Sequence, residues 1–159
     1  MTIEDDVSFF ERVPTLGLLG RQALRILAIG AETRYVHDGE VLFNAGDDAD
    51  GGFVIQEGRF ALSSQDSDEG GEVMVGPFTL LGEAALFTET KRPATATALE
   101  PSTVLRIPRP LFIKTLDSFP DAARKLRDLM AARLDQSTRE MDNLRAVLDA
   151  REPEPSEDS

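Results

Sequence analysis

Two charged side chains suited to a sugar phosphate flank a short apolar stretch near the middle of the chain. Glu83 and Arg92 stand nine residues apart in the segment GEAALFTETKRPATA, residues 82–96. The planar guanidinium of Arg92 can donate two hydrogen bonds to phosphate oxygens. Glu83 would repel a phosphate, so its useful partner is a neutral donor such as a sugar hydroxyl. The pair therefore fits a ribose phosphate. The alternative is a structural ion pair between Glu83 and Arg92 that holds together the two ends of the short helical segment between them.

The residues between the two charges predict a setting for an anion. A turn at Gly76 and Pro77 and a second turn at Gly82 lead into EAALF, a helix of about one turn. The unpaired backbone N–H groups at the start of a helix attract negative charge. Ala84 and Ala85 are small enough to leave room there.

The composition limits the chemistry that this chain can perform. Its 159 residues suffice for about one domain, it contains no cysteine, and it has one histidine. Disulfides and thiolate chemistry are excluded, and a metal site built from several histidines is not expected. No nucleophile or poised histidine stands beside Glu83 and Arg92 in the sequence. We therefore expect no enzyme, no catalytic residue, no metal and no cofactor.

Charge and hydropathy indicate where the protein works. The N-terminus MTIEDDVSFF is acidic where a signal peptide is basic, and no apolar run approaches the length that spans a membrane. The formal net charge is −12, which opposes binding to nucleic acid because affinity for a duplex comes largely from Lys and Arg. We expect a cytoplasmic protein that binds neither membrane nor nucleic acid.

The elements that must position Glu83 and Arg92 follow from the spacing of the apolar residues. Helical periodicity over residues 15–30 predicts an amphipathic helix with one apolar face, formed by Leu16, Leu19, Ala23, Ile26 and Leu27. Residues 32–107 contain short β-type runs separated by glycines, and helical periodicity returns after Pro108. This order predicts a mainly β fold with flanking helices, in which hairpins form an antiparallel roll or sandwich.

The C-terminal helix has a pattern typical of a two-helix seam. Ser118 and Pro120 indicate its start, and the seam positions follow at spacings of four and three: Met130, Leu134, Ser137, Met141, Leu144 and Leu148. We expect this helix to pair with a second copy of itself. Ser137 and its neighbour Thr138 interrupt the apolar seam. Their hydroxyls either fix the register, leave a solvent-filled gap, or face a polar partner.

These segments together resemble the cyclic nucleotide-binding domain family, and most closely the ligand-binding domain of the bacterial catabolite activator. The similarity covers roughly residues 9–148. It includes DGEVLFNAGDDADGGFVIQEGRFAL, which matches the early strands of the family, and LLGEAALFTETKRPATATALE, which matches its phosphate-binding cassette. MAARLDQSTREMDNL is similar to the dimer helix of the catabolite activator. The resemblance implies a β-roll with an N-terminal helix, a short cassette helix and a long C-terminal dimerisation helix.

The resemblance also implies roles for particular residues. Glu83 would bind the ribose 2′-hydroxyl, Arg92 the cyclic phosphate, and Ser137 and Thr138 the adenine, one of them across the dimer. It therefore favours cAMP as the ligand. The complete predicted site comprises Gly82, Glu83, Ala84, Ala85, Arg92, Pro93, Ala94, Thr95, Ser137 and Thr138.

Three departures from the family pattern bear on this assignment. Pro93 occupies a position whose backbone N–H holds the phosphate in the family, and proline has none; Thr95 offers a hydroxyl nearby. Phe78 stands where the family has the second glycine of a turn. The chain also ends where the catabolite activator begins its helix-turn-helix domain, so we expect no DNA-reading module.

The sequence thus predicts a stand-alone, homodimeric receptor domain whose C-terminal helix moves when cAMP binds and signals to an unknown downstream protein. Two alternatives remain. One is a dimerisation scaffold that has lost nucleotide binding, and the other is an accessory to a Crp-type transcription regulator. The predicted organisation is an N-terminal segment at 1–14, a domain at 15–150 with its C-terminal helix at about 118–150, and a disordered acidic tail at 151–159.

Overall fold

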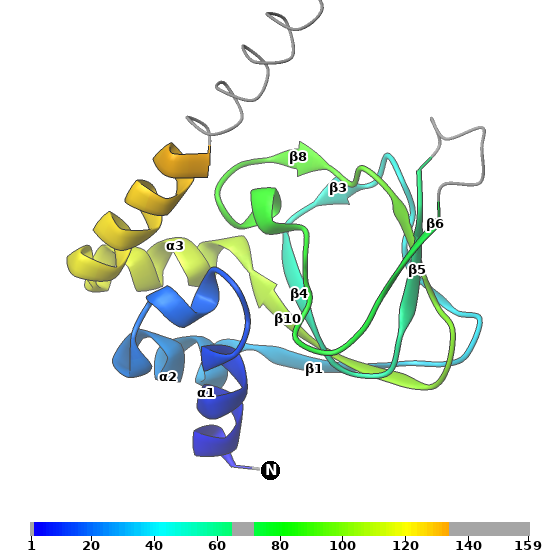
Figure 1. The fold of residues 1–159 in the computed structure, drawn as a ribbon, viewed down its shortest axis with the longest axis horizontal. Helices are drawn as coiled ribbons and strands as arrows, with labels where there is room; N and C mark the ends of the chain where they lie inside the picture. Colours follow the sequence, from blue (N-terminus) through cyan, green and yellow to red (C-terminus); the bar gives the residue numbers. More distant parts are fainter. Residues whose placement is uncertain (1, 65–71, 134–159) are drawn as a thin grey trace, which may run out of the picture. The chain divides into compact units, whose positions relative to one another are not determined.

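The fold was analysed in a computed structural model, which describes residues 2–64 and 72–133. The chain divides into two units, residues 1–123 and 124–159. The first unit holds the β-roll and the helices that flank it (Figure 1). Of the second unit, residues 124–133 are described, and they are helical. The predicted seam beyond Met130 and the predicted acidic tail lie outside the described residues.

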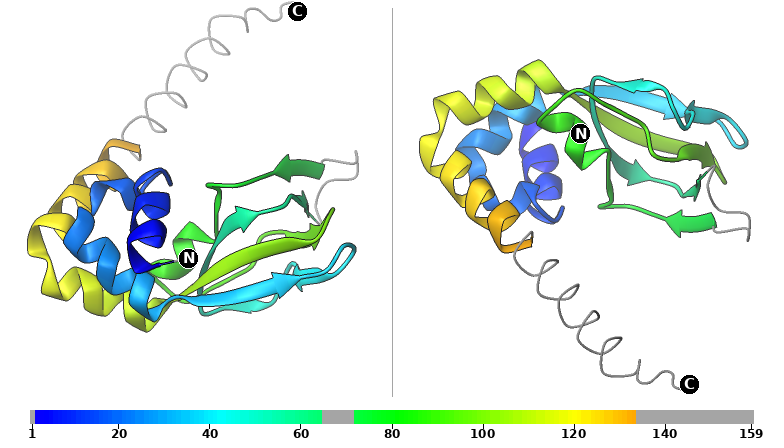
Figure 2. Two further views of the ribbon diagram at one scale, coloured as in Figure 1. Left: turned by 90° about the horizontal axis from the view of Figure 1, so that it is seen from below. Right: turned by 90° about the horizontal axis from the view of Figure 1, so that it is seen from above.

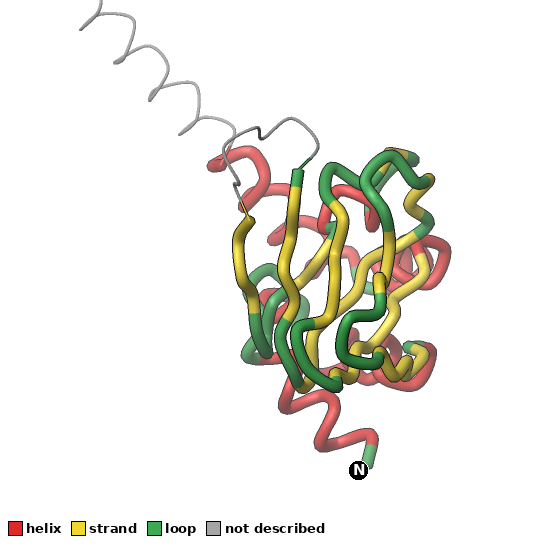
Figure 3. The backbone as a smooth tube through the Cα atoms, turned by 90° about the vertical axis from the view of Figure 1, so that its right-hand side faces the viewer, coloured by secondary structure: helices red, strands yellow, loops and turns green. Residues whose placement is uncertain are grey.

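The two main sheets of the roll are antiparallel and interleave segments that are distant in sequence (Figure 3). One sheet has the order β1-β10-β4-β7, with β1 Glu32–Val36, β10 Ser102–Pro108, β4 Gly51–Glu57 and β7 Leu80–Leu81. The other has the order β2-β9-β5-β6, with β2 Val41–Phe43, β9 Thr95–Ala98, β5 Phe60–Ser63 and β6 Glu72–Val75. A third ladder pairs β3 Asp48–Ala49 with β8 Thr90–Lys91. The predicted roll is confirmed.

Both main sheets contribute to one apolar core. β9 alternates between more and less buried side chains, as a strand with one face on a core must. The buried members of this core are Val36, Leu42, Phe53, Ile55, Phe60, Leu81, Ala96, Ala98 and Val104. This core fixes the register of β9, because slipping that strand by one residue would turn its buried side chains outward.

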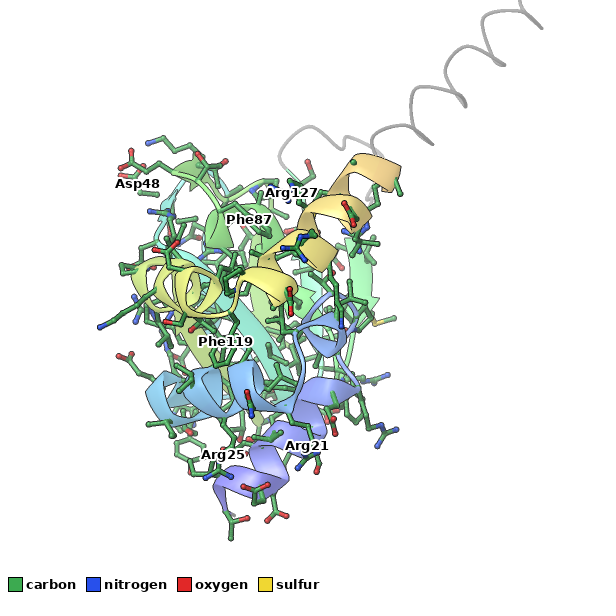
Figure 4. All side chains as sticks on the ribbon, turned by 90° about the vertical axis from the view of Figure 1, so that its left-hand side faces the viewer. Arg21, Arg25, Asp48, Phe87, Phe119 and Arg127 are labelled. Atoms are coloured by element: carbon green, nitrogen blue, oxygen red, sulfur yellow. The ribbon has the colours of Figure 1, made fainter. Side chains whose placement is uncertain are left out.

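The N-terminal region contains one more helix than the sequence predicted. Segment 1–14 includes α1 (Ile3–Glu11), which begins with a capping box between Thr2 and Asp5. Its apolar side chains Val7 and Phe10 are fully buried. Its charged side chains pair with the next helix: Arg21 contacts Glu11 at 2.6 Å and Glu4 at 3.1 Å, and Arg25 also pairs with Glu4 (Figure 4).

The helix predicted at 15–30 is divided in two. A short 3₁₀ helix, η1 (Leu16–Leu18), is followed by α2 (Arg21–Gly30), with Gly20 at φ 88° between them. Ile26, which was predicted to face the core, is 43% exposed, and Leu24 is buried instead. The break at Gly20 rotates the apolar face of α2 relative to the face expected for one continuous helix.

The remaining helices of the first unit meet at one end of the roll (Figure 2). α3 (Arg109–Ser118) starts after Pro108, as predicted, and packs against α2 and η2 (Glu83–Leu86). The rings of Phe87 and Phe112 meet edge to face at 5.4 Å between their centroids. η2, the short helix predicted between Glu83 and Arg92, thus rests on the helices on one side and on β4 on the other.

Candidate functional site

Gly82 forms the turn that places η2 beside Arg92. It is the residue before the helix and adopts the left-handed conformation, with φ 81° and ψ 41°. A Cβ added there would lie 2.2 Å from Nη1 of Arg92. Two separate reasons therefore require glycine at this position: the left-handed backbone conformation and the close approach of the Arg92 guanidinium.

Arg92 is a buried cation. It is 5% exposed, and its backbone is fixed by hydrogen bonds from Arg92 N to Asp47 O and from Gly46 N to Arg92 O, both 2.8 Å. The guanidinium carbon lies 4.5 Å from the ring centroid of Phe43 and 5.4 Å from that of Phe53. These rings hold the side chain from the core side by cation–π attraction.

The guanidinium of Arg92 has unused hydrogen-bonding capacity. Among the described residues, its buried Nη1 has no hydrogen-bond partner. Burial, the largest influence, lowers the pKa of Arg92 from its usual value, because desolvation disfavours the charged form. A buried cation without a hydrogen-bond acceptor destabilises the fold unless an anion joins it. The site therefore has the electrostatics of an anion receptor.

A pocket of about 350 Å³ opens in front of this arginine. Six of the ten predicted site residues line it, together with three residues that the sequence did not indicate: Gly82, Glu83, Ala84, Ala85, Arg92 and Pro93, with Ala49, Thr90 and Lys91. Its volume falls in the range of small-molecule sites. Ser137 and Thr138 lie outside the described residues, so their predicted contact with a base stays a prediction.

Ala94 and Thr95 do not line this pocket. The hydroxyl oxygen of Thr95 accepts a hydrogen bond of 2.9 Å from the backbone N–H of Ala45. Thr95 also belongs to β9, where it pairs with Ser63. The Thr95 hydroxyl thus holds the loop after β2 in place. The sequence had suggested that this hydroxyl could instead contact a phosphate and replace the missing N–H of Pro93.

Glu83 is held by a residue from the N-terminal region. The hydroxyl of Thr15 donates a hydrogen bond of 2.5 Å to Glu83 Oε2. None of the ion pairs recorded between described residues joins Glu83 to Arg92. The geometry therefore does not support the alternative of a structural ion pair between Glu83 and Arg92. Each of the two side chains lines the pocket and has its own contacts elsewhere in the fold.

Phe78 reproduces the turn for which the family uses glycine. It has φ 71°, a conformation that non-glycine residues seldom adopt. Its ring stacks on Phe9 with centroids 4.7 Å apart and lies 4.2 Å from the guanidinium carbon of Arg12. Its N–H donates to Ile55 O at 2.9 Å. The turn before η2 keeps a glycine-like backbone, and packing against α1 compensates for its strain.

Arg109 is a supporting residue that the sequence did not indicate. Its Nε donates to Ala85 O at 2.9 Å, and its Nη2 donates to Ala49 O. Because Ala49 and Ala85 both line the pocket, one side chain connects two parts of its lining to the start of α3. No sequence motif marks this role, since the acceptors are backbone carbonyls that any residue provides.

A larger hollow of about 600 Å³ lies next to this pocket, lined by Asp48, Ala49, Asp50, Glu89, Thr90, Lys91 and Arg109. Most of its charged side chains already have partners. Lys91 pairs with Asp48 on the exposed β3–β8 ladder (Figure 4), and Asp50 pairs with Arg106 at 2.7 Å. The smaller pocket at Arg92 is the better candidate because it holds a buried cation with unused donors.

Comparison with known proteins agrees with this geometry. The family model described as the cyclic nucleotide-binding domain matches residues 33–119, more than half of the chain and all of the pocket lining. The chain belongs to the cyclic nucleotide-binding domain family. The matched region runs from β1 to the end of α3, so the predicted family and fold are both confirmed.

Solved structures place this member of the family among regulatory domains. A cyclic nucleotide-binding-like protein from Brucella abortus is 35% identical, with a TM-score of 0.63, over 71% of this chain and 98% of that one. The N-terminal domain of a transcriptional regulator from Streptomyces coelicolor is 29% identical, with a TM-score of 0.75, over 84% and 94%. The catabolite activator protein of Thermus thermophilus is 25% identical, with a TM-score of 0.65, over 82% and 62%.

Curated relatives carry a similar segment within much longer proteins. A lysophospholipase from Neurospora crassa is 30% identical over 101 residues, which is 62% of this chain and 7% of the enzyme. The comparison therefore concerns one small part of that enzyme. In the described part of the present chain, no helix combines the length and apolar character needed to cross a bilayer.

Proposed function

We propose that this cyclic nucleotide-binding domain is a cAMP receptor in which Arg92 binds the cyclic phosphate and Glu83 the ribose 2′-hydroxyl. The observation that supports this proposal most strongly is the buried guanidinium of Arg92, whose Nη1 lacks a hydrogen-bond partner among the described residues. A cyclic phosphate supplies the missing acceptors and the missing negative charge. The N–H groups at the start of η2 add to this attraction.

The choice of cAMP over other cyclic nucleotides depends on Ser137 and Thr138. These hydroxyls interrupt an otherwise apolar seam in the sequence, and in the resembling dimer helix such a pair contacts adenine. The proposal therefore includes a homodimer formed by the C-terminal helices, each helping to cover a purine. Binding would shift that helix between two states and so inform a downstream protein in the cytoplasm.

The proposal predicts that cAMP stabilises the folded chain. A ligand that binds only the native state adds RT ln(1 + [L]/Kd) to the free energy of unfolding, about 2.7 kcal/mol at a concentration of 100 Kd. We expect the melting temperature of the purified protein to rise with cAMP concentration. In Arg92→Met, which has no guanidinium, this rise should vanish. If millimolar cAMP, cGMP and other cyclic nucleotides leave the wild-type melting temperature unchanged, the receptor function is wrong.

A specific observation supports one competing function. Pro93 lines the pocket and offers no N–H, so a domain that kept the roll while losing its ligand is the second candidate. Such a dimerisation scaffold would keep the same mass and partner binding whether nucleotide is present or not. An accessory role for a Crp-type regulator would require a DNA-reading partner, and a gel-shift with the chain and bulk DNA tests direct binding.

A further inference from the structure

Thr15 has an unusual backbone next to the predicted ribose-binding residue. Its dihedral angles are φ 79° and ψ −52°, close to those of a γ-turn with positive φ. This region is rare for any residue with a side chain and is costly for a β-branched one. Thr15 is nevertheless buried, with 6% of its surface exposed. Such strain persists where the surrounding structure determines it.

The neighbouring contacts explain how this backbone is held. Leu16, the next residue, is fully buried and begins η1. Gly17 donates to Val13 O at 3.0 Å. A Cβ on Gly17 would lie 2.7 Å from Glu11 O, so the turn is pressed against the end of α1. The N-terminal helices thus force Thr15 into one orientation.

That orientation directs the Thr15 hydroxyl onto Glu83. The donor–acceptor distance to Oε2 is 2.5 Å, within the range of hydrogen bonds from a hydroxyl to a carboxylate. A glutamate side chain has three rotatable bonds, and fixing them for a ligand costs entropy. Thr15 fixes the carboxylate before any ligand arrives. An ionised carboxylate accepts about four hydrogen bonds, so a ribose hydroxyl can join Thr15 on it.

We propose that Thr15 is a positioning residue that orients Glu83 for the ribose 2′-hydroxyl, so that the N-terminal helices determine the sugar specificity of the pocket. This inference rests on the proposed function. It adds a residue from outside the matched region 33–119. The proposal also assigns a function to the strained turn at Thr15. The packing of α1 against α2 alone does not require that strain.

The test compares cAMP with 2′-deoxy-cAMP, which lacks the hydroxyl, by calorimetric titration of the full chain. Thr15→Val keeps the shape and β-branching of the side chain and removes only its hydroxyl. We expect this variant to bind cAMP roughly three- to tenfold more weakly, because the Glu83 side chain must then be immobilised when the ribose binds. Its affinity for 2′-deoxy-cAMP should stay within about twofold of wild type. Thr15→Ser, which restores a hydroxyl, should recover cAMP binding.

A matched control separates this role from general loss of stability. Thr115 is also buried, at 1% exposure, and its hydroxyl donates to Leu111 O within α3 at 2.8 Å. Thr115→Val should lower the melting temperature and leave the ratio of the two affinities as in wild type. An equal effect of Thr15→Val on both nucleotides, or none on either, overturns the positioning role. Failure of the wild-type protein to bind either nucleotide overturns the proposed function and this inference with it.

Discussion

At the scale of single residues, the site is defined by how Arg92 is buried. Its guanidinium lies against Phe43 and Phe53, and its Nη1 has no acceptor within the described residues. Desolvation of the cation opposes folding, while cation–π attraction offsets part of that cost. By the proposed function, the ligand-free protein carries a local instability that a bound cyclic phosphate would relieve.

Arg92→Met should increase the stability of the ligand-free protein while removing the group proposed to bind the phosphate. Methionine fills a similar apolar volume without a charge, so we expect the ligand-free chain to gain about 1–2 kcal/mol in unfolding free energy, as when buried ions are replaced by apolar residues. Urea denaturation without nucleotide measures the gain. A large loss of stability in Arg92→Met would contradict the interpretation that the buried guanidinium awaits an anion.

A second residue, Pro93, is expected to limit the affinity of the site for cAMP. Restoring an N–H with Pro93→Ser should raise cAMP affinity about tenfold to a hundredfold, since a hydrogen bond to a charged group contributes roughly 1.5–3 kcal/mol. Titration calorimetry on Pro93→Ser gives the ratio directly. Pro101→Ser, at an exposed proline outside the pocket, is the control and should bind as wild type. A scaffold that has lost its ligand would bind no nucleotide in either variant.

At the scale of elements, the turn at Gly82 joins the two halves of the cassette. η2 and Arg92 can approach each other only because position 82 lacks a Cβ. Arg109 then fixes the far side of η2 through Ala85 O. The pocket therefore depends on the turn at Gly82 with the 3₁₀ helix that follows it, and on the start of α3, which belongs to a separate segment of the chain.

Gly82→Ala and a control variant can distinguish two effects of a Cβ at position 82: the loss of stability from backbone strain and the loss of affinity from displacement of the Arg92 guanidinium. The left-handed conformation costs roughly 1–2 kcal/mol for alanine. Gly39→Ala is a matched control, because Gly39 has φ 83° and a Cβ there would meet nothing within 4 Å. Both variants should lose similar stability in thermal melts. Fluorescent cyclic-nucleotide titration should show at least a tenfold loss of affinity in Gly82→Ala alone, since its Cβ pushes Arg92 away.

The sequence predicted elements well where a pattern extends over several residues. β4, β5, β10 and α3 were expected from alternation or helical periodicity, and all are present. β3, β7 and β8 were missed because each has two residues, too few to show a period of two. α1 was missed because acidic side chains interrupt its apolar face, and only packing by Val7 and Phe10 reveals that face.

At the scale of the whole molecule, the fold belongs to a family whose solved members include regulatory domains. The proposed output needs two copies, because the sequence predicts a C-terminal helix with seam positions at spacings of four and three. A net charge of −12 keeps the surface acidic, which disfavours contact with nucleic acid. The partner that would detect a change in the dimer is therefore expected to be a protein.

The dimer can be tested at a predicted seam position. Leu144→Lys places a charge in the apolar seam, and we expect dimer affinity to fall about a hundredfold or more. Light scattering coupled to size exclusion should then report the monomer mass. Asn143→Lys adds the same charge one position outside the seam and should leave the dimer intact. A dimer that survives Leu144→Lys would mean that the C-terminal helix is not the interface.

The sequence by itself determined the family, the roll and the two charges of the cassette, because these depend on local patterns: glycines at turns, apolar alternation and the nine-residue spacing of Glu83 and Arg92. Only the tertiary structure decided what each charge touches. Thr15 and Glu83 are 68 residues apart, and Arg92 contacts Phe43 of β2 and Phe53 of β4. No local pattern encodes such contacts, because they arise when separate segments are packed around one core.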